Sequence, residues 1–216
     1  MCGRFSLHHP TDDIHERFNI EHPVFLVEPR YNIAPTQPIA VVTPARELVE
    51  MRWGLIPRWS KDGKPWINAR GETLAEKSSF RVAFNQRRVV VPLSGFYEWR
   101  HQGKLRVPLH IRLRDGAPFG VAAIWEPPSS QDGHPTVALV TVAANALIQP
   151  LHQRMPAILS REDEARWLDP VNEAAAGLLR SYPAELMECF TVSTRVNGVK
   201  DDDPGLIVPE RQGLFG

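Results

Sequence analysis

The stretch Val89-Val90-Val91-Pro92-Leu93-Ser94-Gly95-Phe96-Tyr97-Glu98-Trp99 decides the fold class, because it contains two runs typical of β-strands. Val89–Pro92 and Phe96–Trp99 are rich in valine and aromatic residues, which favour strands. Runs of the same character lie on both sides of it: Ile39–Thr43, Leu48–Trp53, Val107–Leu113, Phe119–Ile124 and Val137–Ala143. The chain is therefore expected to be built mainly on β-sheet.

Helical segments are fewer. Four are expected: Thr11–Asn19, Glu72–Phe80, Arg161–Leu168 and Val171–Ser181. Thr11 is an N-cap type of residue and Ser160 can cap the third helix, with acidic residues in both first turns that suit the helix dipole. Strands and helices do not alternate regularly, and the 20 prolines favour short strands and turns. The expected fold is α+β, a single domain on a curved, barrel-like mixed β-sheet with a few flanking helices.

Length and composition narrow the class of protein. The chain has 216 residues, 43% hydrophobic and 23% charged, as in an ordinary globular domain. No apolar run approaches the roughly 18 residues of a membrane span, and no apolar segment follows Met1 as in a signal peptide. Cys2 and Cys189 are too few for a disulfide framework or a four-cysteine zinc site. We expect a cytoplasmic protein without a membrane partner, whose last stretch, Lys200–Gly216, is a loop followed by a loosely packed tail.

The charge is unevenly distributed although the net charge is zero. Residues 52–106 hold 12 basic and only 4 acidic residues. This segment is either a solvated basic face or a surface for an anionic ligand. Four of the six tryptophans also fall in it: Trp53, Trp59, Trp66 and Trp99. Aromatic rings interleaved with arginine suit single-stranded nucleic acid, where rings stack on bases and cations bind phosphates; the alternative is that the tryptophans lie in the core.

Cys2 is the residue with the most distinctive chemistry. Removal of Met1 is plausible before so small a side chain, and it would leave Cys2 with a free α-amine. The reference pKa of such an amine is about 7.7–8.0, so a usable fraction is neutral near pH 7. The amine can condense with an aldehyde to an imine, and the thiolate can then close a five-membered thiazolidine ring. The alternative is an incidental cysteine near a chain end.

Other polar residues add candidates for acid–base chemistry. Glu98 is the one acid in an aromatic strand, where burial would raise its pKa and suit it to proton transfer; alternatively it occupies an exposed, alternate position. Asn68 and Arg70 stand together before an expected helix. His152 could be an acid or base, or a structural histidine. The sequence contains no HExxH, CxxC, GxGxxG or P-loop motif, so we expect neither a metal nor a cofactor.

Six motifs in order resemble those of the SRAP family, the SOS response-associated peptidase-like or abasic-site processing proteins. They are Met1-Cys2-Gly3-Arg4, Tyr31-Asn32-Ile33-Ala34-Pro35-Thr36-Gln37, Trp53-Gly54-Leu55-Ile56-Pro57, Asn68-Ala69-Arg70 with Glu72-Thr73, Gly95-Phe96-Tyr97-Glu98-Trp99, and His152 with Arg154-Met155-Pro156. The resemblance runs over residues 2–209, which we take as the domain, and leaves a short tail at 210–216.

The resemblance implies covalent capture of abasic sites in single-stranded DNA, as part of the DNA damage response. Cys2 would form the thiazolidine, Asn68 would hold the amine or sugar, Glu98 would shuttle protons and His152 would protonate the sugar oxygen. The implied DNA-binding residues are Arg4, Asn32, Pro35, Trp53, Arg70, Arg81, Arg154 and Met155. Self-processing that exposes the cysteine and abasic-site lyase chemistry are also implied. The protein is expected to act as a monomer and to be nucleoid-associated when bound to DNA.

Two other functions remain open from the residues alone. A cysteine peptidase would use Cys2, His152 and Asn68 as a Cys-His-Asn set. A non-covalent DNA reader would use only the basic aromatic surface, with an affinity that falls as salt rises.

Overall fold

The fold is described from a computed structural model, for residues 2–23, 26–60, 62–103, 105–128 and 133–210. Its strands are β1 (Phe5–Leu7), β2 (His22–Pro23), β3 (Arg30–Ile33), β4 (Pro38–Val42), β5 (Glu47–Trp53), β6 (Asn68–Arg70), β7 (Arg88–Leu93), β8 (Gly95–Gln102), β9 (Leu105–Leu113), β10 (Phe119–Glu126), β11 (Thr136–Ala143), β12 (Arg154–Pro156), β13 (Ile158–Leu159) and β14 (Met187–Thr191). Its α-helices are α1 (Thr11–Phe18), α2 (Arg81–Gln86) and α3 (Arg161–Leu168). Short 3₁₀ turns are η1 (Gly71–Thr73), η2 (Ala175–Leu178), η3 (Ala184–Leu186), η4 (Thr194–Asn197) and η5 (Pro204–Ile207).

The core of the molecule is a closed mixed barrel. The antiparallel strands β11, β10, β7, β4 and β5 pair in that order, and β5 then pairs in parallel with β11 at Thr136↔Arg52 and Val137↔Trp53. Every residue of β7 is buried, which agrees with the continuous apolar run Val89–Leu93, and the buried set also includes Arg88. The expected barrel-like mixed sheet of an α+β domain is therefore confirmed.

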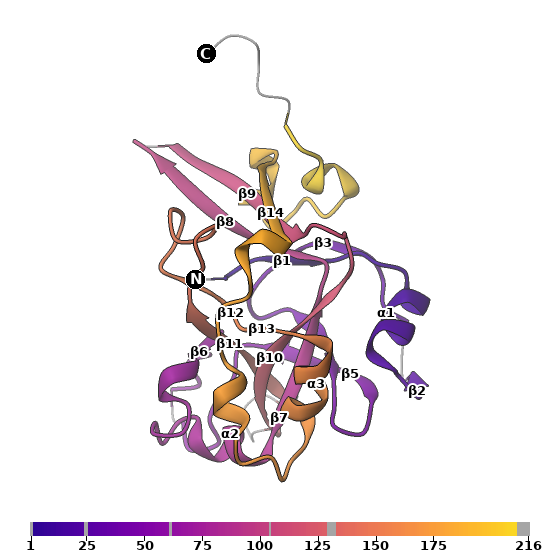
Figure 1. The fold of residues 1–216 in the computed structure, drawn as a ribbon, viewed down its shortest axis with the longest axis vertical. Helices are drawn as coiled ribbons and strands as arrows, with labels where there is room; N and C mark the ends of the chain where they lie inside the picture. The colour runs from indigo at the N-terminus through magenta and orange to yellow at the C-terminus, as the bar shows by residue number, and fades with distance from the viewer. Residues whose placement is uncertain (1, 24–25, 61, 104, 129–132, 211–216) are drawn as a thin grey trace.

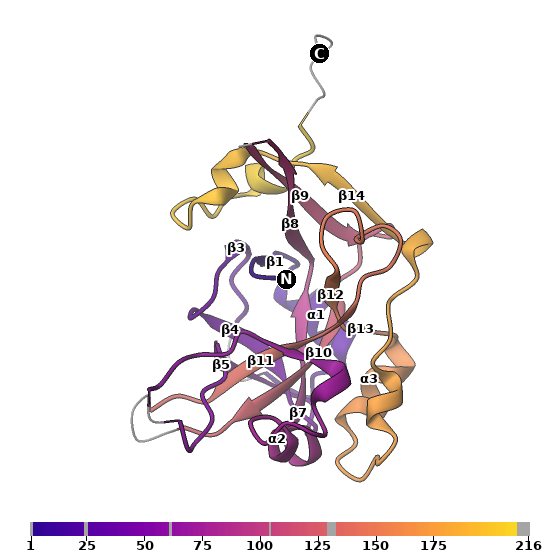
Figure 2. The same ribbon diagram turned by 90° about the vertical axis from the view of Figure 1, so that its left-hand side faces the viewer.

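A second, antiparallel sheet leaves the barrel where β7 passes into β8. Its strands lie in the order β14-β9-β8-β1-β3. The β8–β9 hairpin projects from the body of the molecule, and the segment that follows β14 packs beside it (Figure 1). When the molecule is turned, the N-terminus lies between this sheet and strand β12 (Figure 2). The junction of barrel and hairpin thus positions the chain around Cys2.

The seven predicted strands correspond to β4, β5, β7, β8, β9, β10 and β11. The helix at Arg161–Leu168 is also confirmed, with the Ser160 hydroxyl accepting the Asp163 N–H at 3.2 Å. The first helix is present, but its N-cap is Pro10. The Thr11 hydroxyl instead bonds the backbone of Val27, so it ties the helix to a neighbouring segment.

Two predicted helices are wrong. In place of Glu72–Phe80 the chain forms η1 and a series of turns, because Ser78 and Ser79 favour turns and both Leu74 and Phe80 are drawn into the core. In place of Val171–Ser181 only η2 forms. There the side chains of Asp169 and Asn172 accept nearby backbone N–H groups, which favours turns over a helix.

No helix in the described part of the chain is long and apolar enough to cross a membrane.

The predicted loop from Lys200 is present in its described part, where it includes η5 and packs against the domain. Leu206, in η5, is fully buried. The Asp202 carboxylate accepts the backbone N–H groups of Tyr31 and Asn32 and pairs with Arg30. These contacts fasten the segment to β3. Residues 211–216 lie outside the described residues, so the predicted tail at 210–216 and the boundary at 209 stay predictions.

We expect Asp202→Ala to lower the free energy of unfolding by about 1–3 kcal/mol, because it strips the acceptor from two backbone N–H groups and one guanidinium. Denaturant unfolding measures the change. The matched control is Asp201→Ala, whose carboxylate makes a half-exposed ion pair with Arg195 at 3.3 Å and should contribute about 0–1 kcal/mol. Equal losses in the two variants would contradict the anchoring role of Asp202.

Candidate active site and DNA interface

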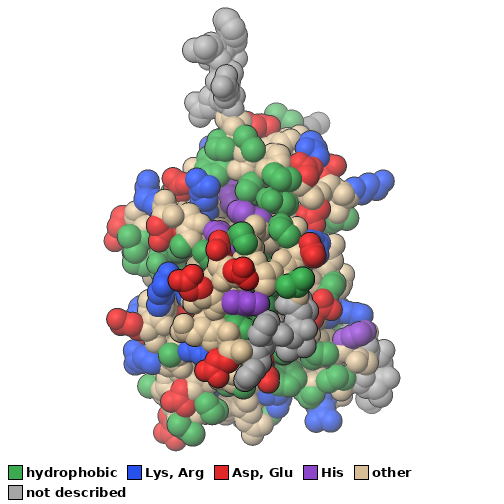
Figure 3. Space-filling view, turned by 90° about the vertical axis from the view of Figure 1, so that its right-hand side faces the viewer, with side chains coloured by type: hydrophobic (Ala, Val, Ile, Leu, Met, Phe, Trp, Pro, Cys, Tyr) green, Lys and Arg blue, Asp and Glu red, His purple; other side chains and the backbone are tan. Residues whose placement is uncertain are grey.

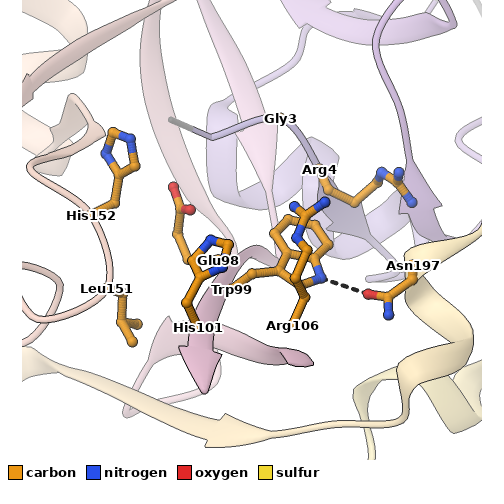
Figure 4. Close-up of a pocket in the computed structure, with 9 residues that line it drawn as sticks. All are labelled: Gly3, Arg4, Glu98, Trp99, His101, Arg106, Leu151, His152 and Asn197. Atoms are coloured by element: carbon orange, nitrogen blue, oxygen red, sulfur yellow. Dashed lines mark hydrogen bonds between the residues drawn. The ribbon is translucent and has the colours of Figure 1, made fainter. Parts of the chain in front are cut away.

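A pocket of about 350 Å³ lies beside the N-terminal segment, along the β8–β9 hairpin (Figure 4). It is lined by Gly3, Arg4, Glu98, Trp99, His101, Arg106, Leu151, His152 and Asn197. These residues come from segments far apart in the sequence: the N-terminus, the hairpin, the loop before β12, and η4. Sequence spacing alone would not bring them together.

Cys2 is fully buried at the start of the chain. Its carbonyl oxygen accepts a hydrogen bond from the Asn68 Nδ2 at 2.9 Å, so β6 fixes the backbone at the predicted nucleophile. Its Sγ faces the carbonyl oxygen of Arg4 at 3.9 Å. Burial, with a further contribution from the charge of Glu98, raises the pKa of the Cys2 thiol far above its usual value. Activation of the sulfur therefore needs a nearby proton acceptor.

Glu98, whose charge acts on the Cys2 thiol, is a candidate for that acceptor. It sits on β8 one residue beyond Tyr97, whose backbone N–H bonds the Arg4 carbonyl at 3.0 Å. Glu98 as a residue is 5% exposed, which rejects the alternative of a solvent-facing strand position. Burial raises the pKa of Glu98, and nearby His152 partly offsets the rise. A carboxylate with a raised pKa is a stronger base, as proton transfer from a thiol requires.

His152 borders the pocket in a defined tautomer. Its Nδ1 accepts the backbone N–H of Arg154 at 2.9 Å, so in the neutral ring the proton resides on Nε2. The Arg154 carbonyl lies farther from the same nitrogen, at 3.3 Å, and the shorter contact with an obligatory donor decides the assignment. His152 therefore offers an N–H donor to an oxygen in the pocket.

The predicted phosphate ligand Arg4 is held on one side of the pocket. Its Nη1 donates to the Asn32 Oδ1 at 2.6 Å and to the carbonyl oxygens of Val196 and Gly198 at 2.8 and 3.2 Å. Burial lowers the pKa of Arg4, although a guanidinium stays charged. Asn32 is 1% exposed. It therefore orients Arg4 and does not present its own amide to a strand of DNA.

A second, larger pocket of about 840 Å³ adjoins the first and shares Leu151 and His152 with it. Arg70 and Arg154 line this second pocket, as predicted for phosphate ligands. Arg70 is exposed, whereas Arg154 forms a two-pronged pair with Glu72, which lowers the pKa of that carboxyl. A phosphate that binds Arg154 would have to compete with Glu72.

Four predicted DNA-binding residues lie elsewhere. Trp53 is fully buried, packs on Phe5 with ring centroids 5.0 Å apart and donates its Nε1 to the Ile67 carbonyl. Met155 is also fully buried. Neither side chain is open to a base, because each fills the core beneath the site. Pro35 is half-buried outside both pockets, and Arg81 is exposed on α2, at the end of the molecule away from the N-terminus (Figure 1).

Sequence reasoning missed several residues of the first pocket as ligands: His101, Arg106, Leu151 and Asn197. The sequence held a signal for His101 and Arg106, because a β-hairpin that continues past Trp99 places alternate residues on one face. Trp99 is half-buried, and Trp59 and Trp66 are exposed by 62% and 39%. The basic aromatic segment is thus partly core and partly surface.

The hydrogen bonding differs from that of a Cys-His-Asn peptidase. In such a set the asparagine orients the histidine ring. Here Asn68 donates to the Cys2 carbonyl, and the His152 Nδ1 accepts a backbone N–H. Among the described residues, no group of His, Cys, Asp and Glu side chains is arranged to hold a metal ion.

Fold and site together define a protein that has a buried cysteine at residue 2, a buried glutamate and a histidine beside a closed mixed barrel. The chain belongs to the SOS response associated peptidase (SRAP) family, whose model matches residues 1–199. It is 41% identical to the abasic site processing protein YoqW of Bacillus subtilis, over 96% of this chain and 99% of that protein. It is also 33% identical to the abasic site processing protein HMCES of Gallus gallus, over 78% of this chain and 59% of that protein.

Solved structures show the same fold. A protein from Bacteroides thetaiotaomicron superposes with a TM-score of 0.87 at 26% identity, covering 97% of this chain and 100% of its own. A protein from Bordetella bronchiseptica superposes with a TM-score of 0.78 at 24% identity, over 89% of this chain and 100% of its own.

Proposed function

We propose that this protein processes abasic sites in single-stranded DNA by capturing them covalently through Cys2. The observation that carries the proposal is that Asn68 holds the backbone of Cys2 next to Gly3, in a segment that borders the pocket lined by Glu98 and His152. The relatives named as abasic site processing proteins support the same substrate class.

The chemistry begins once Met1 has been removed. The α-amine of Cys2 adds to the aldehyde of the opened abasic sugar and loses water, which leaves an imine. The sulfur then attacks the imine carbon, the thiol proton passes through Glu98 to the nitrogen, and a thiazolidine ring closes. The Nε2–H of His152 donates to the sugar oxygen. No cofactor takes part in these steps.

Single-stranded DNA is the proposed partner, with the protein acting as a monomer. Arg4 binds phosphate on one side of His152, and Arg70 and Arg154 bind it on the other. Removal of Met1 by the site itself, and strand cleavage through the imine, are implied by the family resemblance and belong to the same proposal. A peptidase with external substrates is disfavoured by the bonding of Asn68 and His152.

The test is denaturing electrophoresis of protein whose mass shows that it begins at Cys2. We expect a slowly migrating band that survives heating when the single-stranded DNA carries one abasic site. Undamaged DNA of the same sequence should give no such band. If protein that begins at Cys2 gives no band with the abasic strand, covalent capture is wrong.

A further inference from the structure

The covalent chemistry uses only some of the residues that line the first pocket. Trp99, His101 and Arg106 also line it, and they come from the β8–β9 hairpin (Figure 4). His101 stands directly opposite Arg106 in the hairpin register, and Trp99 lies two residues before His101. The three side chains therefore share a face, since alternate residues of a strand point the same way and cross-strand partners are neighbours.

Arg106 is a cation that is held in place without being neutralised. Its guanidinium carbon lies 5.4 Å from the centroid of the Trp99 ring, a cation–π arrangement. The ring is itself fixed, because its Nε1 donates to the Asn197 Oδ1 at 2.6 Å. In the part of the chain that the structure describes, no carboxylate forms an ion pair with Arg106. Its donors thus remain available to an anion.

The surroundings of Arg106 are positive. From Trp99 to Arg106 the sequence holds three lysines and arginines and no aspartate or glutamate, whereas Arg112, farther along β9, is paired with Glu188. Arg4 lines the same pocket, and Glu98 is the one acid among its lining residues. The opposite face of the molecule differs, because acidic and basic side chains are interspersed there (Figure 3). An extended polyanion would therefore be attracted to the hairpin side.

We propose that Arg106, which packs over the Trp99 ring, binds a backbone phosphate of the DNA strand on the hairpin side of the abasic site. Leu151 and His152 line both pockets, so the reacting centre lies between two basic arms. Arg106 and Arg4 form one arm, and Arg70 and Arg154 form the other. This inference rests on the proposed function and adds a second point at which the strand is fixed.

The arm formed by Arg106 and Arg4 binds the backbone of the DNA strand and does not select bases. Because the guanidinium covers one face of the Trp99 ring, a base cannot stack on that face. Contacts to phosphates position a strand without carrying sequence information. Asn197 is then a positioning residue, which acts on the DNA only through the orientation of Trp99.

The test compares Arg106→Gln with Arg100→Gln by equilibrium binding to intact single-stranded DNA over a range of salt concentrations. Arg100 is exposed on the same hairpin but does not line the pocket, so its variant loses the same charge at a matched position. We expect Arg106→Gln to bind about tenfold more weakly at low salt. Its slope of log affinity against log salt should fall by about 0.7, the value for one lost phosphate contact on a single strand. Arg100→Gln should keep both affinity and slope, and Arg106→Lys should restore most of the slope.

Strands with nucleotides on only one side of a terminal abasic site locate the contact. Arg106→Gln should slow adduct formation with one of the two strand polarities and leave the other unchanged. Equal effects on both polarities, or equal effects of the two glutamine variants, would overturn the inference, provided that unfolding temperatures show all variants to be folded. An adduct that forms normally in Arg106→Gln with an unchanged salt slope overturns this inference alone. If the unmodified protein forms no adduct, the proposed function fails as well.

Discussion

Replacing Cys2 with alanine is expected to abolish the heat-stable adduct with abasic DNA, a loss of at least about 100-fold in yield. Alanine keeps the α-amine, so the imine still forms, but no sulfur is present to close the ring and the imine hydrolyses on heating. Denaturing electrophoresis of heated samples measures the loss. Alanine is also small enough for Met1 to be removed ahead of it, which intact mass verifies.

Two controls separate this result from misfolding or loss of DNA binding. Reduction with borohydride should trap the imine in Cys2→Ala, because an imine is converted to a stable amine and a free strand is not. Cys189→Ala removes the other cysteine, which is half-buried on β14 and outside both pockets, and should leave the adduct unchanged. A heat-stable adduct from Cys2→Ala without reduction would refute the thiazolidine.

Local composition was sufficient to predict the seven principal strands. A run such as Val89–Pro92 has few alternatives to a buried strand, because its β-branched residues both favour extended backbone and need a core. The closure of the barrel could not be predicted in the same way. It depends on parallel pairing of Arg52 with Thr136, and nothing in either strand's own sequence specifies a partner so distant.

Burial was the property that the sequence predicted least well. Trp53 belongs to a segment whose sequence is typical of a basic aromatic surface, yet its ring packs on Phe5 in the core. Whether a tryptophan supports the site or contacts the ligand is decided by its neighbours in space. By contrast, the position of one acid in an aromatic strand correctly indicated a raised pKa for Glu98, because Glu98 lies in the buried first half of β8.

The convergence of Cys2, Glu98 and His152 came from the family resemblance and not from spacing. The structure adds what motifs could not contain, namely hydrogen-bond partners. The Asn68 amide on the Cys2 carbonyl and the backbone N–H on His152 Nδ1 fix the backbone and the tautomer. These two bonds assign a specific role to the Asn68 amide and to each ring nitrogen of His152.

Glu98→Gln should slow adduct formation by about 100- to 1,000-fold, within the range for loss of a positioned acid–base group. Glutamine has nearly the same shape but cannot accept the thiol proton or return it to nitrogen. In the unmodified protein the rate should fall as the pH drops through the raised pKa of Glu98, because the protonated carboxyl is no longer a base. The variant should lose that dependence and follow the α-amine alone. Rates from quenched time courses between pH 5 and pH 9 test this at about half-unit steps.

The same substitution should stabilise the fold near neutral pH, which distinguishes a catalytic role from a structural one. Burial raises the pKa of Glu98, so the folded protein favours the protonated carboxyl. Its contribution to stability is fully present below the unfolded-state pKa, about 4.3, and is lost as the pH rises through the folded-state value. Glu98→Gln should therefore unfold at a higher temperature than the unmodified protein at pH 7.5, with the difference vanishing near pH 4. A variant that is slower and also less stable at pH 7.5 would assign Glu98 to the architecture of the pocket and remove it from the proton transfer.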